Sequence, residues 1–138
     1  MKEQRNYYSD GKFKTIGFPV SHKENEKRRA IMPDHVSGIN HPDRLFFEEG
    51  HGLVLEIPNK EYARYGCIIA PRETVLEQDV ICDPKIGDAD YLESLHKGQT
   101  IFGWVHATQN RDITDKIING GLTAYAWENM NYKGRHLF

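Results

Sequence analysis

Short apolar runs alternate with polar segments along this chain of 138 residues. Each run holds five to seven residues, is rich in Val, Ile, Phe or Ala, and is bounded by glycine, proline or charged residues. Runs of this length predict strands, and the polar segments of helical period between them predict helices. The predicted strands are residues 14–20, 44–49, 66–70, 79–83, 100–105 and 122–127.

Proline and aspartate indicate where the helices between these strands begin. Pro33 with Asp34 suits the first turn of one helix, and Pro71 suits the first position of another, because a proline there loses no intrahelical hydrogen bond. Asp88 can cap a third helix through its carboxylate. The left-handed residues expected just after helices are Gly98 and Gly120.

This alternation predicts an α/β domain of three layers, flavodoxin-like or Rossmann-like, with a mostly parallel sheet of five or six strands. Crossovers in such a sheet are right-handed and place helices on both faces. The length fits one domain, which we assign to residues 14–131. Residues 1–13 have charges and tyrosines but no apolar core, so we expect a flexible N-terminal extension.

Charge and cysteine content narrow the class of protein. Lys and Arg number 18 and Asp and Glu 20, so the net charge of −2 offers no field that would attract nucleic acid or an anionic membrane. No apolar run has the length of a membrane span, and we expect a soluble, cytoplasmic protein. Cys67 and Cys82 lie in apolar runs without metal-site spacing, which favours two buried, reduced thiols and no metal site.

Three residues follow predicted strands at the edge where α/β domains bind ligands. Arg28 lies in the loop after the first strand, Lys85 follows "VICDP", and His106 follows "TIFGWV". An arginine and a lysine together can hold a carboxylate, and a histidine can exchange protons near neutral pH. Singly, each residue is also typical of surface charge or of a structural hydrogen bond; their shared edge favours a site.

Four segments resemble, in order, the N-terminal domain of the alanine dehydrogenase and pyridine-nucleotide transhydrogenase family. They are "KTIGFPVSHKENEKRRAIMPDHV", "DVICDPKIGD", "GQTIFGWVHAT" and "LTAYAWENM". They resemble the family's first strand with its arginine loop, its lysine strand, its histidine strand and the strand that leads to the crossover. Within the family, "ENEKRRA" and "WENM" are most similar to N5-(carboxyethyl)ornithine synthase.

The resemblance implies roles for the three residues. The family's substrate arginine, which stands five residues before the proline, falls on Arg28 rather than Arg29. Its substrate lysine falls on Lys85 and its catalytic histidine on His106. The synthase resemblance implies an oxidoreductase that reductively condenses pyruvate with the side-chain amine of ornithine or lysine, using NADP or NAD.

The family's nucleotide site is absent from this sequence. It contains no G-x-G-x-x-G, and we interpret Gly50 and Gly52 as a turn after the second strand rather than a phosphate loop. The resemblance implies that a separate domain or subunit binds the cofactor. Residues 132–138 would begin the crossover to that domain.

Two functional classes remain open. The first is the substrate-binding and catalytic half of an enzyme, which alone would be inactive and would bind a small keto acid and an amine. The second is a non-catalytic module that kept the fold and binds a small molecule or another protein. Because a face that packs on the second domain would be exposed, we expect an oligomer or a heteromeric partner.

Overall fold

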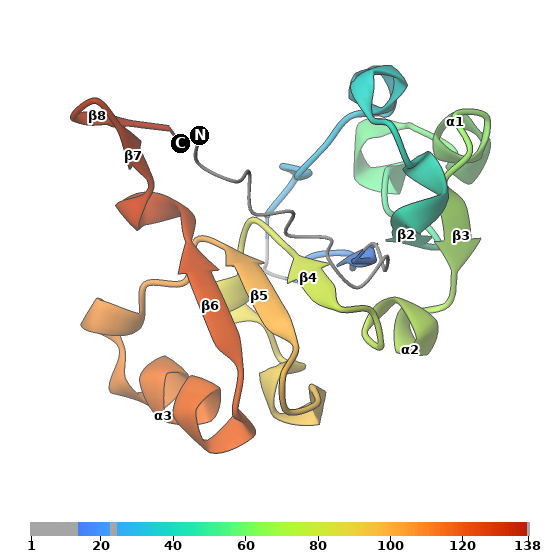
Figure 1. Cartoon of the computed structure of the whole chain (residues 1–138). Coiled ribbons are helices and arrows are strands. Elements are labelled where there is room, and N and C mark those ends of the chain that lie inside the picture. The colour runs from blue at the N-terminus through green and yellow to red at the C-terminus, as the bar shows by residue number, and fades with distance from the viewer. Residues whose placement is uncertain (1–13, 23–24, 138) are drawn as a thin grey trace, which may run out of the picture.

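The apolar runs form one six-stranded sheet in the computed structural model, which describes residues 14–22 and 25–137. Every neighbouring pair of its strands is parallel, with helices between them (Figure 1). The strands are β1 (Ile16–Phe18), β2 (Leu45–Glu48), β3 (Ile68–Ala70), β4 (Val80–Cys82), β5 (Thr100–Gly103) and β6 (Thr123–Ala126). Each lies within a predicted strand, so the predicted fold class is confirmed. The predicted extension, residues 1–13, lies outside the described residues.

The strand order is β3-β2-β1-β4-β5-β6, which is the doubly wound order. Strands β2 and β3 are added on one side of β1, and β4, β5 and β6 are added on its other side. The loops that follow β1 and β4 therefore leave the sheet toward opposite sides. This divergence opens a crevice beyond the carboxyl ends of the two strands, where α/β proteins bind ligands.

The connections are mostly single turns, because glycine and proline interrupt nearly every polar segment. The α-helices are α1 (Asn59–Ala63), α2 (Arg72–Val75) and α3 (Arg111–Gly120). The 3₁₀ turns are η1 (Pro33–Gly38), η2 (Pro42–Arg44), η3 (Leu53–Leu55), η4 (Ile86–Asp88), η5 (Leu92–Ser94), η6 (Ala107–Gln109) and η7 (Trp127–Asn129). A short antiparallel pair, β7 (Asn131–Tyr132) and β8 (Arg135–His136), follows η7.

Three of the predicted helix ends are shifted or wrong. Pro33 does begin η1 and Gly98 is left-handed, with φ +91°. Pro71, however, is the N-cap of α2 rather than its first residue. Asp88 is the last residue of η4 rather than the N-cap of a following helix, because the next segment makes only the separate turn η5, whose N-cap is Tyr91. The left-handed residue after α3 is Gly121, with φ +63°, while Gly120 is the last helical residue.

The two faces of the sheet carry different cores, since alternate residues of a strand point to opposite faces. One core is aromatic and contains Phe18, Phe47 and Tyr62, with the ring centroids of Phe18 and Phe47 4.5 Å apart. The other is aliphatic and joins Ile81 and Ile101 of the sheet to η4, η5 and α3. The sheet is thus anchored on both faces by side chains that the strand pattern predicts.

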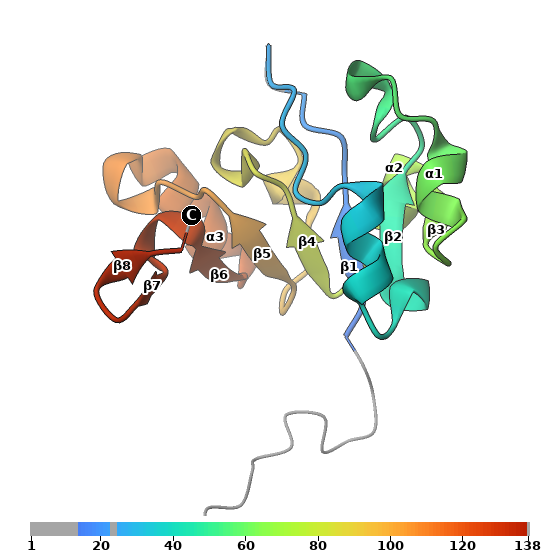
Figure 2. The same ribbon diagram turned by 90° about the horizontal axis from the view of Figure 1, so that it is seen from above.

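The helical cover is not equal over the two halves of the sheet. Figure 2 shows η1, in cyan, in front of β1 and β2, with α2 and α3 on the far face. The near face of β4 and β5 has no helix of the described residues in front of it (Figure 2). Three layers are therefore complete only over β1 and β2.

Cys67 and Cys82 are free and buried, as predicted. Burial raises the pKa of the Cys67 thiol to about 11 and raises that of Cys82 further. Within the described ranges, no helix has the length and apolar character needed to cross a membrane.

Candidate functional site

The three predicted site residues lie in loops that leave neighbouring strands at the same edge of the sheet. Arg28 belongs to the loop after β1, Lys85 follows β4, and His106 follows β5. Because β1, β4 and β5 are adjacent and parallel, their carboxyl ends lie side by side. That the three side chains touch one small ligand stays a prediction.

Trp104 connects these three loops. Its backbone N–H donates to the Pro84 carbonyl (3.2 Å), and its own carbonyl accepts from the Gly87 N–H (3.1 Å), so both bonds flank Lys85. The Arg28 guanidinium lies over the Trp104 ring, 4.9 Å from its centroid, and His106 is two residues further along the chain. One tryptophan therefore ties the positions of all three candidates together.

A glutamate fixes one side of the Arg28 guanidinium. Arg28 Nε donates to Oε1 of Glu26 and Nη2 donates to Oε2, each at 2.9 Å. The Arg28 backbone N–H also donates to Oε1 at 2.9 Å. This clamp lowers the pKa of Glu26 to about 2, with the Lys85 charge as a further contributor. Glu26 is therefore ionised near neutral pH.

Arg29 holds the same loop from the other side. Its Nε donates to the carbonyl of His51 and its Nη1 donates to the carbonyl of Arg28 at 2.9 Å. Its guanidinium is thus occupied by backbone carbonyls, which suits a structural role. That Arg28 rather than Arg29 binds the ligand stays a prediction.

A buried carboxyl supports the loop of Lys85. Asp83 accepts the Lys85 backbone N–H at 2.9 Å and the Tyr91 hydroxyl at 2.8 Å. Burial raises the pKa of the Asp83 carboxyl, against these two hydrogen bonds, and burial beside Asp83 raises that of Tyr91 well above its usual range. The pair sets the backbone from which the Lys85 side chain departs.

An ion-pair network braces the crevice beside Asp83. Arg72 of α2 pairs with Glu48 at the end of β2 (3.3 Å) and with Asp90 (3.0 Å), and it lies over the Tyr91 ring. Glu48 also accepts the Val20 N–H at 2.6 Å. Charged, partly buried groups thereby link the ends of β1 and β2 to the loop after β4.

His106 sits in a constrained turn. Its φ is +56°, a left-handed conformation that is uncommon for a residue with a side chain and is often found at functional sites. The Glu128 carboxylate stabilises the turn by accepting the N–H groups of Val105 (3.0 Å) and His106 (3.2 Å). Glu128 Oε2 lies 3.9 Å from Nδ1 of His106.

A small cavity of about 120 Å³ lies in the crevice between the loops after β1 and β4. Lys85, Asp83 and Tyr91 line one side, and Ser21 and His22 line the other. Arg28 and His106 are not among its lining residues. In this conformation the cavity therefore combines Lys85 with the end of β1 but does not unite the three candidates.

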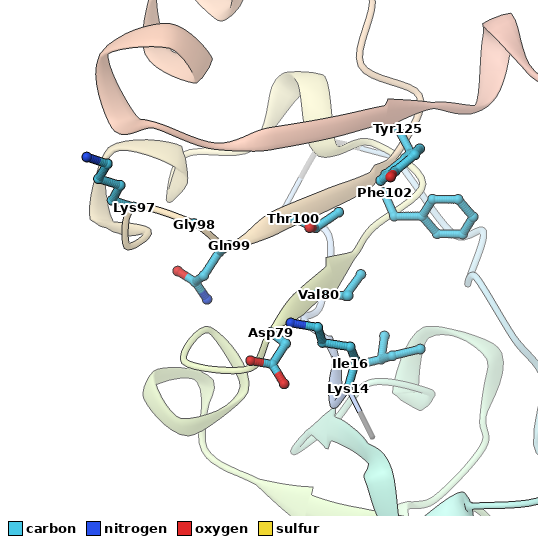
Figure 3. Close-up of a pocket in the computed structure, with 10 residues that line it drawn as sticks. All are labelled: Lys14, Ile16, Asp79, Val80, Lys97, Gly98, Gln99, Thr100, Phe102 and Tyr125. Atoms are coloured by element: carbon cyan, nitrogen blue, oxygen red, sulfur yellow. The ribbon is translucent and has the colours of Figure 1, made fainter. Parts of the chain in front are cut away.

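A larger cavity lies elsewhere, toward the amino ends of the strands. It measures about 520 Å³ and runs along the uncovered face of the sheet. Figure 3 shows Lys97 and Gln99 at one end and Phe102 with Tyr125 at the other. Its floor is sheet surface, and the residues that carry the predicted chemistry are absent from it. Size alone does not identify the functional site here.

The glycines after β2 do not form a phosphate loop. Gly50, with φ +84°, makes the predicted turn after β2, while a Cβ on Gly52 would come within 2.7 Å of Ile57. Gly52 is therefore required by packing and does not form an open phosphate cradle. No group of three or more His, Cys, Asp or Glu side chains within residues 14–22 and 25–137 could hold a metal ion.

Sequence reasoning missed the residues that hold the candidates in place. Glu26, Trp104 and Glu128 are all inside segments that carried the family resemblance, yet none was singled out. The pattern of a glutamate two residues before an arginine was the one signal available for Glu26. Trp104 and Glu128 act across strands, and spacing along the chain does not reveal such contacts.

Comparison with protein families gives a match over nearly the whole chain. Residues 17–137 match the family model described as "Alanine dehydrogenase/PNT, N-terminal domain". The N(5)-(carboxyethyl)ornithine synthase of Clostridium botulinum (strain Hall) is 37% identical over 92 residues, which are 66% of this chain and 28% of that protein. The alanine dehydrogenase of Bacillus subtilis (strain 168) is 30% identical over 124 residues, 88% of this chain and 32% of that protein.

A solved L-alanine dehydrogenase has the same fold, with a TM-score of 0.77 and 22% identity over 88% of this chain and 34% of that one. The chain thus spans about a third of the length of the relatives it matches.

Proposed function

Since the chain belongs to the alanine dehydrogenase/PNT N-terminal domain family, we propose that it is the substrate-binding and catalytic part of an amino-acid oxidoreductase. Its substrates would be a small 2-oxo acid such as pyruvate and the side-chain amine of ornithine or lysine. The synthase relative supports this choice over a simple alanine dehydrogenase, because its identity of 37% exceeds the 30% of the dehydrogenase, although over a shorter segment.

The observation that carries this proposal is the position of Trp104. Its backbone is hydrogen-bonded to the residues on either side of the Lys85–Ile86 segment, Pro84 and Gly87. Its ring lies under the Arg28 guanidinium, and it precedes His106 by two residues. Two cations and one proton carrier at the carboxyl edge of three adjacent strands suit a 2-oxo acid, which has a carboxylate next to a carbonyl.

Each residue has a distinct role in the proposal. Arg28 binds the carboxylate of the 2-oxo acid, and Lys85 adds a second positive charge near the carboxylate or the carbonyl oxygen. His106 hydrogen-bonds that oxygen and protonates it as the amine adds and water leaves. Glu128 holds the backbone of His106 in place by accepting its N–H group.

The reductant would be a nicotinamide, NADP or NAD, which supplies hydride when bound. Because the glycines after β2 do not form a phosphate loop, we assign its binding to another domain or subunit and expect an oligomer or a heteromeric assembly. We expect the 138-residue chain by itself to bind the 2-oxo acid without reducing it.

The carboxylate site can be tested on the chain itself. We expect ¹⁵N NMR titration with pyruvate to give a dissociation constant of about 1 mM or weaker, because the charges act close to water. Arg28→Ala should abolish the response. Arg111→Ala removes the same charge from α3, where the side chain is 93% exposed, and should leave binding unchanged.

Two results would refute the proposal. One is no binding of pyruvate by the wild-type chain, and the other is equal binding by the Arg28→Ala variant. His106→Gln separates the roles further, since it should keep pyruvate binding while it removes turnover in the complete enzyme.

A further inference from the structure

The sheet has two edge strands, and they differ in how far they are covered. β3 forms one edge, with α1 alongside the strand (Figure 2); there Ile69 is half-buried and Ala70 is buried. β6 forms the other edge, and its residues Thr123, Ala124 and Tyr125 are all exposed. No strand of the described residues pairs with the outer side of β6. The sheet is therefore open at β6.

The backbone of β6 presents hydrogen-bonding groups on this open side. The Thr123 N–H donates to the carbonyl of Gln99 at 3.0 Å, so the N–H and carbonyl of Thr123 face β5. In a strand of a parallel sheet, successive residues turn these two groups to opposite sides. The N–H and carbonyl groups of Ala124 and Ala126 therefore face away from β5, toward the place where a further strand would lie.

β6 also lacks the features that keep an edge strand from pairing. Natural edge strands are protected by lysine or other charged side chains, by proline or by a bulge. The residues of β6, Thr123–Ala126, include no charge and no proline, and their register with β5 runs without a bulge. Because the strand is neutral, an identical strand beside it would meet no repulsion between like charges.

A second copy of β6 fits this edge when the two strands run antiparallel, as a two-fold axis through the sheet requires. Antiparallel residues that lie opposite each other exchange hydrogen bonds when both turn their N–H and carbonyl groups across the gap. Placing Ala124 opposite Ala126 of the second copy, and Ala126 opposite its Ala124, meets this condition at both pairs. Tyr125 then lies opposite Tyr125 of the second copy.

The Tyr125 side chain gives this register a specific contact. It lies on the uncovered face of the sheet beside Phe102, its register partner on β5, and is 57% exposed (Figure 3). Opposite residues in a non-hydrogen-bonded antiparallel pair have Cα atoms about 4.5 Å apart and side chains on the same face. The two Tyr125 rings would therefore contact each other, and aromatic pairs of this kind stabilise antiparallel strands.

We propose that β6 pairs with β6 of a second copy of this chain, which joins two six-stranded sheets into one continuous sheet with Tyr125 at the two-fold axis. The pairing closes into a dimer, because both copies use the same edge. The strands of the two copies run in opposite directions, so their carboxyl ends, which carry the candidate sites, lie at opposite ends of the joined sheet. The inference is therefore independent of the proposed function.

Disulfide formation tests the register. Tyr125→Cys would place two thiols opposite each other, within the roughly 4.4–6.8 Å between Cα atoms that a disulfide spans. Thr123→Cys is the matched control, because it lies on the same face of the same strand but about 14 Å from its copy in this register. Cys67 and Cys82 are buried. After mild oxidation, we expect most of the Tyr125→Cys chain, and less than about a tenth of Thr123→Cys, to run as a dimer on a non-reducing gel.

A proline tests the backbone hydrogen bonds. Ala124→Pro removes an N–H that faces away from β5, so the ladder with β5 stays intact while pairing with the second copy loses a donor and meets the proline ring. We expect sedimentation equilibrium to show wild-type dimers at about 0.1–1 mM protein, since the interface is small. Association of Ala124→Pro should be at least about tenfold weaker. A ¹⁵N NMR spectrum unchanged outside β5 and β6 shows that the variant is folded.

Three results would overturn the inference. They are a wild type that stays monomeric over this whole concentration range, equal oxidation of Tyr125→Cys and Thr123→Cys to dimers, and a folded Ala124→Pro that associates like the wild type. If Ala124→Pro does not fold, the two cysteine variants decide the question alone. None of these results bears on pyruvate binding by Arg28, so the proposed function stands or fails separately.

Discussion

The two halves of the sheet are built differently. Around β1 and β2, the sheet is covered on both faces, and an aromatic core of Phe18, Phe47 and Tyr62 fills the space under η1 and α1. Around β4, β5 and β6, helices cover one face, and the other exposes Tyr125 to 57% (Figure 2). Arg28 comes from the half that is covered on both faces, whereas Lys85 and His106 come from the half that is covered on one face.

One half of the sheet thus holds its loop in a fixed position, whereas the other half leaves an apolar face exposed. The covered half holds its arginine loop through Arg29, which donates to the carbonyl of His51, and through the Tyr62 hydroxyl, which donates to the carbonyl of Ile31. The other half keeps an apolar face that contains Phe102 and Tyr125, next to a cavity of about 520 Å³. The candidate site lies where the two halves meet, between the ends of β1 and β4.

Truncating one phenylalanine in each half tests most directly whether the two halves differ in packing. Phe47 is 0% exposed and stacks on both Phe18 and Tyr62, so Phe47→Ala should lower the free energy of unfolding by about 4 kcal/mol. Phe102 is half-buried on the open face, so Phe102→Ala should lower it by about 1–2 kcal/mol. Urea denaturation of both variants measures the difference. Equal losses would show that the open face is packed as tightly as the covered one.

Acid should weaken the covered half through His51. This histidine is buried against Phe18, Phe47 and Tyr62, and burial together with the Arg29 cation lowers its pKa to about 3, against an opposing contact with the Phe18 backbone. The ring is neutral in the folded chain, whereas the unfolded chain takes up a proton near pH 6.5. Protonation of His51 in the unfolded chain therefore leaves the free energy of unfolding unchanged above pH 6.5. It lowers that free energy as the pH falls toward 3, by about 3 kcal/mol at pH 4.

The check is the slope of unfolding free energy against pH, measured by urea denaturation between pH 7 and 4. His51→Leu should flatten that slope, whatever it does to stability at pH 7. His136→Gln, at an exposed position on β8, should keep the wild-type slope. An unchanged slope in His51→Leu would show that His51 is not the group that titrates.

A glycine substitution tests how closely the strands of the second half pack near the site. A Cβ on Gly103 would lie 1.9 Å from the Asp83 backbone oxygen, so Gly103→Ala must displace the loop that carries Lys85. We expect a loss of about 2 kcal/mol. Gly38→Ala is the matched control, because nothing lies within 4 Å of its Cβ, and it should change stability by less than about 0.5 kcal/mol. Thermal unfolding of both variants measures this, and a tolerated Gly103→Ala would mean that the loop is movable.

The strands could be predicted because their information is local. Six apolar runs bounded by glycine, proline and charged residues gave all six strands of the parallel sheet. Helix ends were predicted less well, since Gly120 and Gly121 are equally able to adopt the left-handed conformation, and it is Gly121 that adopts it at the end of α3. Asp88 had the chemistry of a cap but no continuing helix to cap.

The sequence by itself determined the parallel α/β sheet, the family resemblance and the strand after which each candidate residue lies. It could do so because strand pattern and motif spacing are properties of neighbouring residues. Only the tertiary structure decided that Trp104 joins three loops and that Glu128 holds His106. The loops concerned are separated by many residues in the chain, and their contacts exist only after the order β1-β4-β5 brings the strand ends together.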